Sequence, residues 1–363
     1  MAATNVVVVG GGIVGASIAH YLAKLGAKPL IIEQCGVACH SSGKGAGFLA
    51  LNWNDRSPVG ALARRSFQLH QELADEFGAE QIGYRRLNCI SCSAGNTPLR
   101  GPESRAWLDR TTGDFQPMGS TETLAQVQPR KLTEALVDSA TGNGATLLID
   151  KVIGMKTTAA TGGVQVCEVL TEKTGPICCD AAVIAMGPWS QAASGWFPSA
   201  GLPERTALHK YTSVTFDAVL DDTAVFLTSS NDVQIYPRED ETYACGFPRM
   251  EDLPASPLDI TPCDTIATRL KQEATSCSSL LESSATKTTA ACYLPGGSAD
   301  GLPVIGQIPG VSNAFMACAH TCWGILNAPA TGEAIAQMAM ASGSVNLKAF
   351  AVGRSSALSR FRF

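Results

Sequence analysis

The sequence has few charged residues and no run of either sign. Of its 363 residues 16% are charged, and 27 basic against 32 acidic residues leave a formal net charge of −5. The basic residues are scattered, so the chain has no patch that would attract nucleic acid, and a nucleic-acid partner is not expected.

A long uninterrupted apolar run is also missing. The apolar stretch from Val6 is broken by glycines and has neither a basic segment before it nor a small-residue cleavage site after it. A signal peptide and a membrane span are therefore not expected. The last residues, SRFRF, match no peroxisomal or retention signal. We expect a cytoplasmic protein, while a removed transit peptide and the oligomeric state stay open.

The cysteines do not form the pattern of a secreted disulfide framework. There are 13, an odd number spread over predicted strands and loops, so we expect mostly buried reduced thiols. Cys89 and Cys92 form a CxxC without a second pair at a zinc-like spacing, which favours packing over metal or redox chemistry. Cys35, Cys39 and His40 lack an evident fourth ligand. We expect no metal, because a loop beside a bound molecule explains these residues equally well.

The most informative feature is the run VVVVGGGIVGASIAHYLAKLGAKPLIIEQ from Val6. It predicts a buried strand, a glycine turn, a helix and a second strand that ends at Glu33. Gly10 permits the turn, Gly12 admits a pyrophosphate and Gly15 lets the helix approach the strand, which matches GxGxxG. Glu33 is placed to accept hydrogen bonds from an adenosine ribose. A glycine turn in an ordinary α/β loop is the alternative.

A second glycine-rich segment, CHSSGKGAGFLALNWN from Cys39, follows the second strand. The backbone amides of Ser42, Gly43 and residues 45–47 are placed to bind anionic or carbonyl oxygens of a cofactor, and Lys44 adds positive charge. A flexible surface loop is the alternative reading.

The rest of the chain predicts a mixture of helices and strands, and a hydrophobic content of 45% suffices for two domains. We expect helices at 66–77, 129–140 and 259–283, and irregular structure at 96–120. NGATLLIDKVIGM predicts a turn and a strand, and CCDAAVIAMGPWS a buried strand ending in a glycine turn. Further strands are expected at 84–93, 212–216, 225–227, 233–236, 242–247, 290–294 and 315–317.

The C-terminal block DGLPVIGQIPGVSNAFMACAHTCWGILNAPATGEAIAQMAM from Asp300 is the second strong signal. Together with the N-terminal run, SSGKGAGF, AMGPWS and IYPRED, it resembles the FAD-dependent D-amino-acid oxidase (DAO) family, which includes glycine and sarcosine oxidases. The segments CYLP, DGLPVIG and HTCWGILNAPATG are most similar to a fungal and plant branch of FAD-dependent oxidoreductases whose substrates are poorly defined.

The resemblance implies an α/β fold: a Rossmann-like FAD-binding domain of the glutathione-reductase type with an inserted antiparallel-sheet α+β substrate domain. It assigns residues 1–85, 129–210 and 291–363 to the FAD-binding domain, and 86–128 and 211–290 to the substrate domain.

The resemblance also implies a set of FAD-binding residues. They are Gly10, Gly12, Ile13, Val14, Gly15, Glu33, Gln34, Ser41, Ser42, Gly43, Lys44, Ala46, Gly47, Phe48, Val152, Ala185, Gly187, Trp189, Gly301, Pro303, Cys322, Trp323, Gly324 and Ile325. The helix that begins near Gly324 would direct its positive end at the flavin and stabilise the charge that reduction brings. A buried structural helix is the alternative.

Non-covalent FAD is expected. Some relatives attach the flavin through a cysteine or a histidine. Cys292 lies one residue from the cysteine position, and Lys44 or Gly45 stands where the histidine would be needed.

The arginine that holds a substrate carboxylate in such amino-acid oxidases is replaced by Leu294, and Cys322 stands at a second arginine position. Arg249, Arg238 and Lys210 are the candidates to supply the missing charge; a solvated surface residue is the alternative for each.

Aromatic and imidazole side chains are expected at the reactive face. The predicted catalytic set is Tyr236, His320, Trp323 and Arg249, and Tyr243 is a further lining candidate; core packing is the alternative for each aromatic residue. No dedicated base is required, because hydride passes directly from the substrate carbon to the flavin.

The expected function is FAD-dependent oxidation of a C–N bond in a small amine or N-substituted amino acid, with molecular oxygen as acceptor and hydrogen peroxide as product. The alternatives are a dehydrogenase with another acceptor and a flavoprotein with a binding or trafficking role and little turnover. An NAD-dependent dehydrogenase would leave the C-terminal block unexplained.

Overall fold

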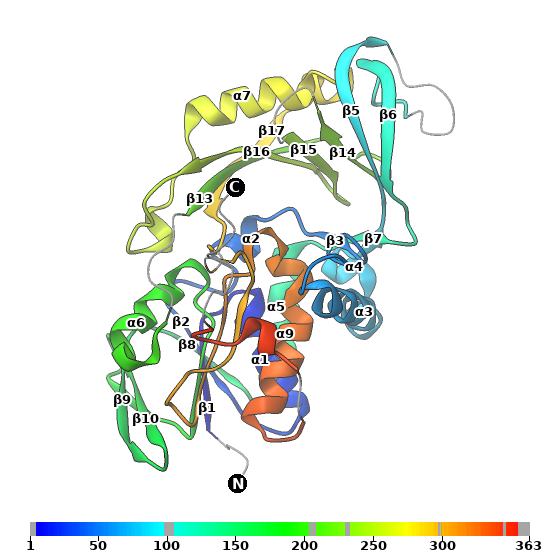
Figure 1. Ribbon diagram of the computed structural model, residues 1–363. Helices are drawn as coiled ribbons and strands as arrows, with labels where there is room; N and C mark the ends of the chain where they lie inside the picture. The colour runs from blue at the N-terminus through cyan, green and yellow to red at the C-terminus, as the bar shows by residue number, and fades with distance from the viewer. Residues whose placement is uncertain are drawn as a thin grey trace.

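Two large β-sheets organise the chain, one above the other in Figure 1. The computed structural model describes residues 5–97, 105–202, 208–228, 233–296, 298, 300–343 and 346–354. The lower sheet has six strands, nearly all parallel. The upper sheet has seven strands, nearly all antiparallel.

The six-stranded sheet is the doubly wound part of the fold. Its strands, in spatial order, are β18 (Val304–Gln307), β19 (Ala314–Cys318), β12 (Ala181–Ile184), β1 (Val6–Val9), β2 (Leu30–Glu33) and β8 (Thr146–Ile149). All neighbours are parallel except β18 and β19. The carboxyl ends of the parallel strands therefore meet at one edge, where such sheets bind ligands.

The run of four valines in β1 is explained by burial on both faces of this sheet. Val6 and Val8 pack in a cluster with residues of the helices, whereas Val7 and Val9 pack in a cluster on the opposite face. The helices are α1 (Ile13–Lys24), α3 (Gly60–Phe77), α5 (Pro129–Gly142) and α9 (Gly324–Ala339). The opposite face is covered by a three-stranded sheet of β9 (Val152–Ala160), β10 (Gly163–Thr171) and β11 (Pro176–Cys178).

The seven-stranded sheet carries α7 (Asp264–Thr275) on one face. Its strands, in spatial order, are β17 (Thr286–Tyr293), β13 (His209–Phe216), β16 (Thr242–Met250), β15 (Val233–Pro237), β14 (Thr223–Leu227), β5 (Asn88–Thr97) and β6 (Thr111–Gly119). Because side chains alternate between faces, Ile235 and Ala244 pack in the cluster with α7. Tyr236 and Tyr243 pack in a different cluster, on the face opposite α7.

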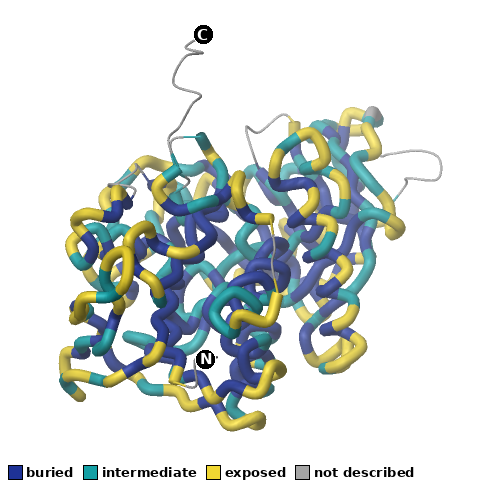
Figure 2. Tube along the Cα trace, turned by 60° about the horizontal axis from the view of Figure 1, so that its bottom comes forward, coloured by how far each residue is buried: buried dark blue, intermediate teal, exposed yellow. Residues whose placement is uncertain are grey.

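Short elements complete the fold. They are the three-stranded sheet of β3 (Phe48–Ala50), β7 (Leu124–Gln126) and β4 (Arg85–Arg86), the helices α2 (Ser41–Lys44), α4 (Ala79–Ile82), α6 (Ala193–Trp196) and α8 (Ser279–Ser283), and 3₁₀ turns, of which η4 (Thr321–Trp323) leads into α9. Figure 2 shows the buried residues gathered along the central helices and strands, with exposed residues on the outer loops. Among the described residues, no helix is both long and apolar enough to cross a bilayer.

The expected α/β fold class is confirmed, and so are the strand, helix and strand of the N-terminal run. Several expectations about elements are wrong. The single strand expected in NGATLLIDKVIGM is two strands of different sheets, β8 and β9. Residues 96–120 contain β6, which pairs with β5 and uses Pro117 at the sheet edge, where its missing N–H is tolerated. The single helix expected at 259–283 is divided into η3 (Pro257–Asp259), α7 and α8.

The division into two domains stays a proposal. Its expected boundaries at 210 and 290 fall inside β13 and β17, which are continuous strands.

Candidate active site

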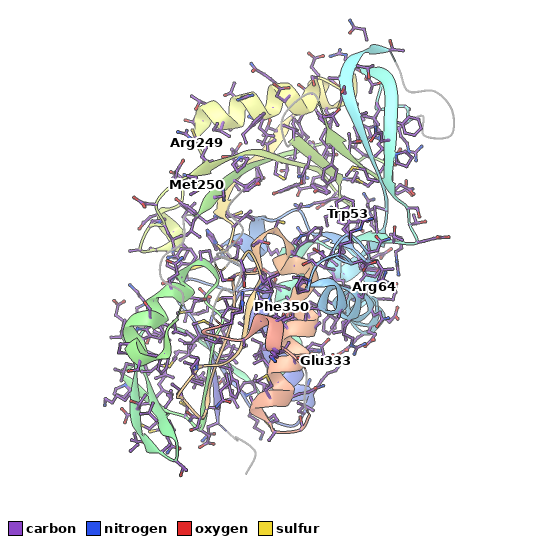
Figure 3. The ribbon with its side chains drawn as sticks, viewed as in Figure 1. Trp53, Arg64, Arg249, Met250, Glu333 and Phe350 are labelled. Atoms are coloured by element: carbon purple, nitrogen blue, oxygen red, sulfur yellow. A yellow bond between two sulfur atoms is a disulfide. The ribbon has the colours of Figure 1, made fainter. Side chains whose placement is uncertain are left out.

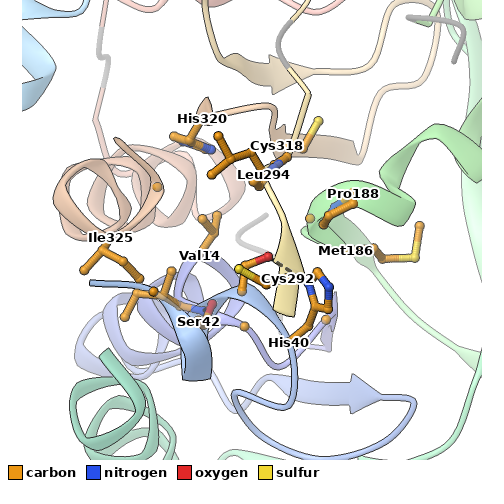
Figure 4. Close-up of a pocket in the computed structure, with 18 of the residues that line it drawn as sticks. Val14, His40, Ser42, Met186, Pro188, Cys292, Leu294, Cys318, His320 and Ile325 are labelled. Carbon is orange, nitrogen blue, oxygen red and sulfur yellow. Dashed lines mark hydrogen bonds between the residues drawn. The ribbon is translucent and has the colours of Figure 1, made fainter. Parts of the chain in front are cut away.

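A cavity of about 600 Å³ opens at the carboxyl edge of the parallel sheet. Its walls come from both large sheets. In the lower sheet, Val9 is the last residue of β1 and Ala185 directly follows β12; Tyr236 and Tyr243 come from the upper sheet. Figure 4 shows Cys292 and Leu294, at and just beyond the end of β17, between Val14 on one side and Pro188 on the other.

The glycine turn after β1 forms one end of the cavity. Gly10 has a φ of +115°, and a Cβ there would stand 2.4 Å from the carbonyl oxygen of Ala185, so only glycine fits. Gly12 caps α1 without a side-chain hydrogen bond, and it lines the cavity with Ile13. The N–H of Ile13 donates to Ser42 Oγ at 2.9 Å. The start of α1 thus presents backbone N–H groups and the positive helix end to this wall.

Glu33 closes β2 at the same end of the cavity. Its carboxylate accepts hydrogen bonds from the N–H of Gly11 at 2.7 Å and from the N–H of Cys35 at 3.0 Å. Cys35 and Cys39 form a disulfide beside it. These two cysteines are therefore not among the reduced thiols that the sequence leads us to expect for most of the 13, while Cys39 does line the cavity as the loop interpretation implies.

The start of α9 reaches the cavity from the other side. Gly324 and Ile325 line it, and Trp323 caps the helix without a side-chain hydrogen bond. The helices α1 and α9 approach closely at Gly332, where a Cβ would stand 2.6 Å from the carbonyl carbon of Ser17. This close packing holds two helix N-termini in the wall of one cavity.

The turn before α9 has an unusual backbone. Ala319 has a φ of 63° and Thr321 a φ of 53°, which side chains with a Cβ rarely adopt. His320, between them, is buried and shares a hydrogen bond of 3.0 Å between its Nε2 and Thr331 Oγ1 of α9. Burial lowers the pKa of His320 to about 4. This neutral imidazole ties the turn to α9.

His40 holds the loop after β2 against the end of β17. Ser41 Oγ donates to the carbonyl oxygen of Tyr293 at 2.7 Å, and the N–H of Tyr293 donates to His40 Nε2 at 3.4 Å. His40 Nδ1 lies 2.7 Å from Ser41 Oγ and must donate, so the three bonds form a closed ring. Burial, with a smaller contribution from Lys44, lowers the pKa of His40 to about 3, which matches this neutral tautomer.

Aromatic side chains cover the part of the cavity under the upper sheet. We call Phe48, Trp53, Phe226, Tyr236, Tyr243 and Trp323 the aromatic wall; all of them line the cavity. Phe48 and Trp53 have ring centroids 5.1 Å apart, and Trp53 and Trp323 are 6.2 Å apart. Tyr236 and Tyr243 lie opposite each other on neighbouring strands. Their hydroxyls donate to Gln234 Oε1 at 2.6 Å and to the carbonyl oxygen of Lys44 at 2.9 Å.

The sequence matches the family described as FAD dependent oxidoreductase, DAO, over residues 5–338. The chain belongs to the DAO family of FAD-dependent oxidoreductases. The Schizosaccharomyces pombe protein named "Putative oxidoreductase C1F5.03c" is 30% identical over 371 residues, which cover 92% of this chain and 93% of that protein.

Solved structures of two bacterial oxidases have the same fold. Glycine oxidase from Bacillus cereus ATCC 14579 superposes with a TM-score of 0.78 at 21% identity, covering 97% of this chain and 99% of that one. Iminodiacetate oxidase from Chelativorans sp. BNC1 has a TM-score of 0.75 at 19% identity, covering 96% and 98% of the two chains.

The cavity of this DAO-family enzyme fits its cofactor, FAD. Its volume of about 600 Å³ is in the range of sites that enclose an organic ligand. A Cβ at Gly12 would stand 3.2 Å from Ser42 Oγ and occupy space next to the start of α1. Gly187, with a φ of +53°, lines the cavity with no atom within 4 Å of the position of a Cβ. The chain thus leaves room for a dinucleotide where side chains would obstruct it.

Most of the residues expected to bind FAD line the cavity. They are Gly10, Gly12, Ile13, Val14, Glu33, Gln34, Ser41, Ser42, Ala46, Gly47, Phe48, Val152, Ala185, Gly187, Trp189, Cys322, Trp323, Gly324 and Ile325. Tyr236, His320 and Trp323 of the expected catalytic set line it as well.

Five residues expected to bind FAD lie outside the cavity lining. A Cβ at Gly15 would stand 2.0 Å from the carbonyl oxygen of Gly10, and one at Gly43 would stand 2.0 Å from that of Ala38, so both glycines serve close packing. Lys44 contributes its carbonyl oxygen to Tyr243.

The other two of these five, Gly301 and Pro303, belong to a turn held by Arg354. The guanidinium of Arg354 pairs with Asp300 at 2.7 Å and donates to the carbonyl oxygen of Pro303 at 3.0 Å.

Arg249, expected in the catalytic set, does not line the cavity. Its side chain is 54% exposed and lies 4.0 Å from Glu251, at the outer end of β16. Figure 3 shows Arg249 beside Met250, on the opposite side of the molecule from Trp53 in this view.

The two other candidate cations are also absent from the cavity lining, and each pairs with a carboxylate outside it. Lys210 pairs with Glu251 at 2.9 Å. Arg238 pairs with Glu241 at 2.7 Å, donates to the carbonyl oxygen of Gly45 at 2.7 Å and stacks on the Tyr243 ring. Arg238 thus supports the cavity lining from behind.

Sequence reasoning missed several lining residues: His40, Trp53, Asp150, Lys151, Met186, Pro188, Trp196, Phe226, Gln234 and Thr321. Asp150 and Lys151 directly precede Val152, so the strand expected on the adenosine side was the signal that could have identified them. Trp53 and Phe226 carry no local signal, because only the packing of β3 and β14 brings them together.

Cys89 and Cys92 are both buried free thiols in β5. They pack in two different clusters, since residues three apart on a strand point to opposite faces. The packing interpretation of this CxxC is therefore confirmed.

Proposed function

We propose that this enzyme oxidises a C–N bond of a small amine or N-substituted amino acid, by hydride transfer from the carbon that bears the nitrogen. The proposal is supported by the neutrality of the titratable side chains around the aromatic wall. Burial keeps the pKa of His320 at about 4, raises that of Cys245 to about 12 and raises those of Tyr236 and Tyr243 well above their usual range. None of them is poised to exchange a proton near pH 7. Hydride transfer from a neutral amine requires no such group.

When bound, FAD supplies the oxidant, which accepts the hydride with its two electrons. The substrate loses this hydride from carbon and a proton from nitrogen, so an imine remains, and water hydrolyses it to a carbonyl compound and a free amine. The two named bacterial oxidases, for glycine and iminodiacetate, support this reaction class.

The residues of the chain have separate tasks in this proposal. Glu33 binds the adenosine ribose, and the start of α1 binds the diphosphate. The start of α9 directs its N–H groups at the flavin, where negative charge develops on reduction. His320 positions the turn before α9, and the aromatic wall excludes water from the reacting carbon.

Molecular oxygen is proposed as the acceptor, with hydrogen peroxide as product, and FAD is proposed to be held without a covalent bond. The cytoplasmic location expected from the sequence stays a prediction.

The test is an anaerobic screen in which amines and amino acids are mixed with the holoenzyme and the flavin absorbance is followed. Rapid bleaching by at least one compound is expected, and failure of all of them, in a protein that dithionite bleaches, would contradict the proposal. Exposure of the reduced enzyme to oxygen then separates an oxidase, which reoxidises fast with release of peroxide, from a dehydrogenase. Acid precipitation should leave all flavin in the supernatant.

A further inference from the structure

The substrate end of the cavity contains no charged side chain among the residues that the structure describes. The charged lining residues are Glu33, Asp150 and Lys151. They lie together at the end of the cavity proposed to hold the adenosine. Glu33 lies opposite Ile149 in the parallel pairing of β2 and β8, and the N–H of Asp150 donates to the backbone carbonyl oxygen of Glu33 at 2.9 Å. A substrate carboxylate at the aromatic wall would have no cation in this lining.

Lys44 is half-buried and its charge acts on Cys292 and His40, but it does not itself line the cavity. The three cations that the sequence offered are committed to other partners. Arg238 is 9% exposed; it forms an ion pair with Glu241, donates to the carbonyl oxygen of Gly45 and lies over the Tyr243 ring. Lys210 and Arg249 both face Glu251. Moving any of them into the cavity would leave a carboxylate unpaired, and for Arg238 this carboxylate, that of Glu241, is only 14% exposed.

The residue directly after β17 is the apolar Leu294, at the position where related amino-acid oxidases are expected to carry an arginine that binds the substrate carboxylate. Leu294 lines the cavity there, next to Cys292. Burial raises the pKa of Cys292 to about 11, so this thiol is neutral as well. A carboxylate that left water for this surface would lose its hydration without gaining an ion pair.

The aromatic wall provides a different kind of recognition. Six rings from β3, β14, β15, β16, η4 and the segment after β3 form one continuous surface, and Phe226 stands 6.0 Å from Trp53 and 5.9 Å from Tyr236 by ring centroids. Ring faces bind apolar groups through buried area and attract an ammonium through their quadrupoles.

We propose that the substrate is an amine without a carboxylate on the reacting carbon, which carries an apolar or aromatic substituent bound against the aromatic wall. This inference rests on the proposed C–N oxidation and names its substrate class.

A matched pair of substrates tests the inference. N-methylbenzylamine and N-methylphenylglycine differ by one carboxylate on the reacting carbon, and each is mixed anaerobically with the holoenzyme. The amine is expected to bleach the flavin at least ~100-fold faster at equal concentration, since a buried unpaired charge is costly. Equal or faster bleaching by the amino acid would overturn the inference and leave C–N oxidation standing.

A binding measurement decides the inference even without turnover. Benzoate and benzyl alcohol are titrated into the oxidised holoenzyme, and the perturbation of the flavin spectrum gives each Kd. Benzyl alcohol is expected to bind more tightly than benzoate, and the reverse order would overturn the inference. If no amine or amino acid bleaches the flavin, the proposed reaction fails, while these titrations still report on the carboxylate.

Two pairs of variants connect the result to named residues. Leu294→Arg should tighten benzoate binding by about tenfold, because a guanidinium matches both carboxylate oxygens, whereas Leu294→Met should not.

Phe226→Leu should weaken binding of N-methylbenzylamine about fivefold through the lost ring surface. Phe115→Leu is its control, on the same sheet but outside the cavity lining. Unchanged amine binding in Phe226→Leu would contradict the assigned surface.

Discussion

At the scale of single residues, the structure separates two arginines that look equivalent in the sequence. Arg238 and Arg249 both follow aromatic strand residues, and both were candidates for binding a substrate. Arg238 is 9% exposed and Arg249 is 54% exposed. The difference in exposure arises from position in the sheet. Arg249 lies opposite Lys210 in the antiparallel register of β13 and β16, at the outer end of both strands.

This contrast predicts different effects on stability. Arg238→Met leaves Glu241 and the carbonyl oxygen of Gly45 without their partner, so the free energy of unfolding should fall by about 3 kcal/mol. Arg249→Met should change it by less than ~0.5 kcal/mol, as exposed pairs contribute little. Urea denaturation of both variants at pH 7 measures this, and equal losses would refute the assignment of Arg238 as a buried support.

Glu33 provides a second prediction at this scale. Its carboxylate terminates β2 and accepts one backbone N–H on each oxygen, so Glu33→Gln removes the charge and sets an NH2 donor against one of these N–H groups. The affinity for FAD should drop about tenfold, because charge-assisted hydrogen bonds to the ribose are lost. Fluorescence titration of apoprotein with FAD measures the effect. Glu80→Gln, at an exposed site in α4, is the control and should bind FAD as the unmodified protein does.

At the scale of elements, the pairing of α1 and α9 determines where both helix N-termini point. Gly332 permits this approach, and a Cβ there would also stand 2.7 Å from Ser17 Cβ. The site therefore depends on a contact that lies well inside the helices, remote from the cavity lining.

Gly332→Ala should destabilise the protein by about 2 kcal/mol through overpacking, although alanine favours a helix elsewhere. It should also weaken FAD binding, since the two helix starts would separate. Gly142→Ala, at the end of α5 with nothing within 4 Å of its Cβ, is the matched control and should be neutral or stabilising. Thermal melts with and without FAD report both effects, and a stable Gly332→Ala variant with normal FAD affinity would refute this account of the helix pair.

The elements that could be predicted are those with a complete local signal. The strand, glycine turn and helix from Val6 to Lys24 follow from hydrophobic periodicity and turn chemistry alone. The strand β6 could not be predicted, because Gly113 and Pro117 lower its strand propensity and only its pairing with β5 stabilises it. The aromatic wall could not be predicted for the same reason, because Trp53 and Phe226 come together only through tertiary packing.

At the scale of the whole molecule, buried histidines couple stability to pH. Burial lowers the pKa of His20, His70 and His320 to about 4 and that of His40 to about 3. An unfolded histidine titrates near 6.5, so below that pH the unfolded chain binds protons that the folded chain does not.

Stability should therefore be fully present above about pH 6.5 and decline by several kcal/mol down to pH 4. His70→Gln should reduce the slope, because Gln Nε2 can replace the donor to the carbonyl oxygens of Ile325 and Leu326 without titrating. Urea denaturation at pH 7, 6, 5 and 4.5 measures this, and stability that does not change across the range would contradict it.

In the molecule as proposed, the two large sheets enclose FAD on one side and an uncharged aromatic surface for an amine on the other. The most direct test is a single anaerobic turnover with N-methylbenzylamine, in which bleached flavin and released benzaldehyde are both quantified. One benzaldehyde is expected for each flavin reduced. Bleaching without aldehyde, or a flavin that stays oxidised, would contradict it.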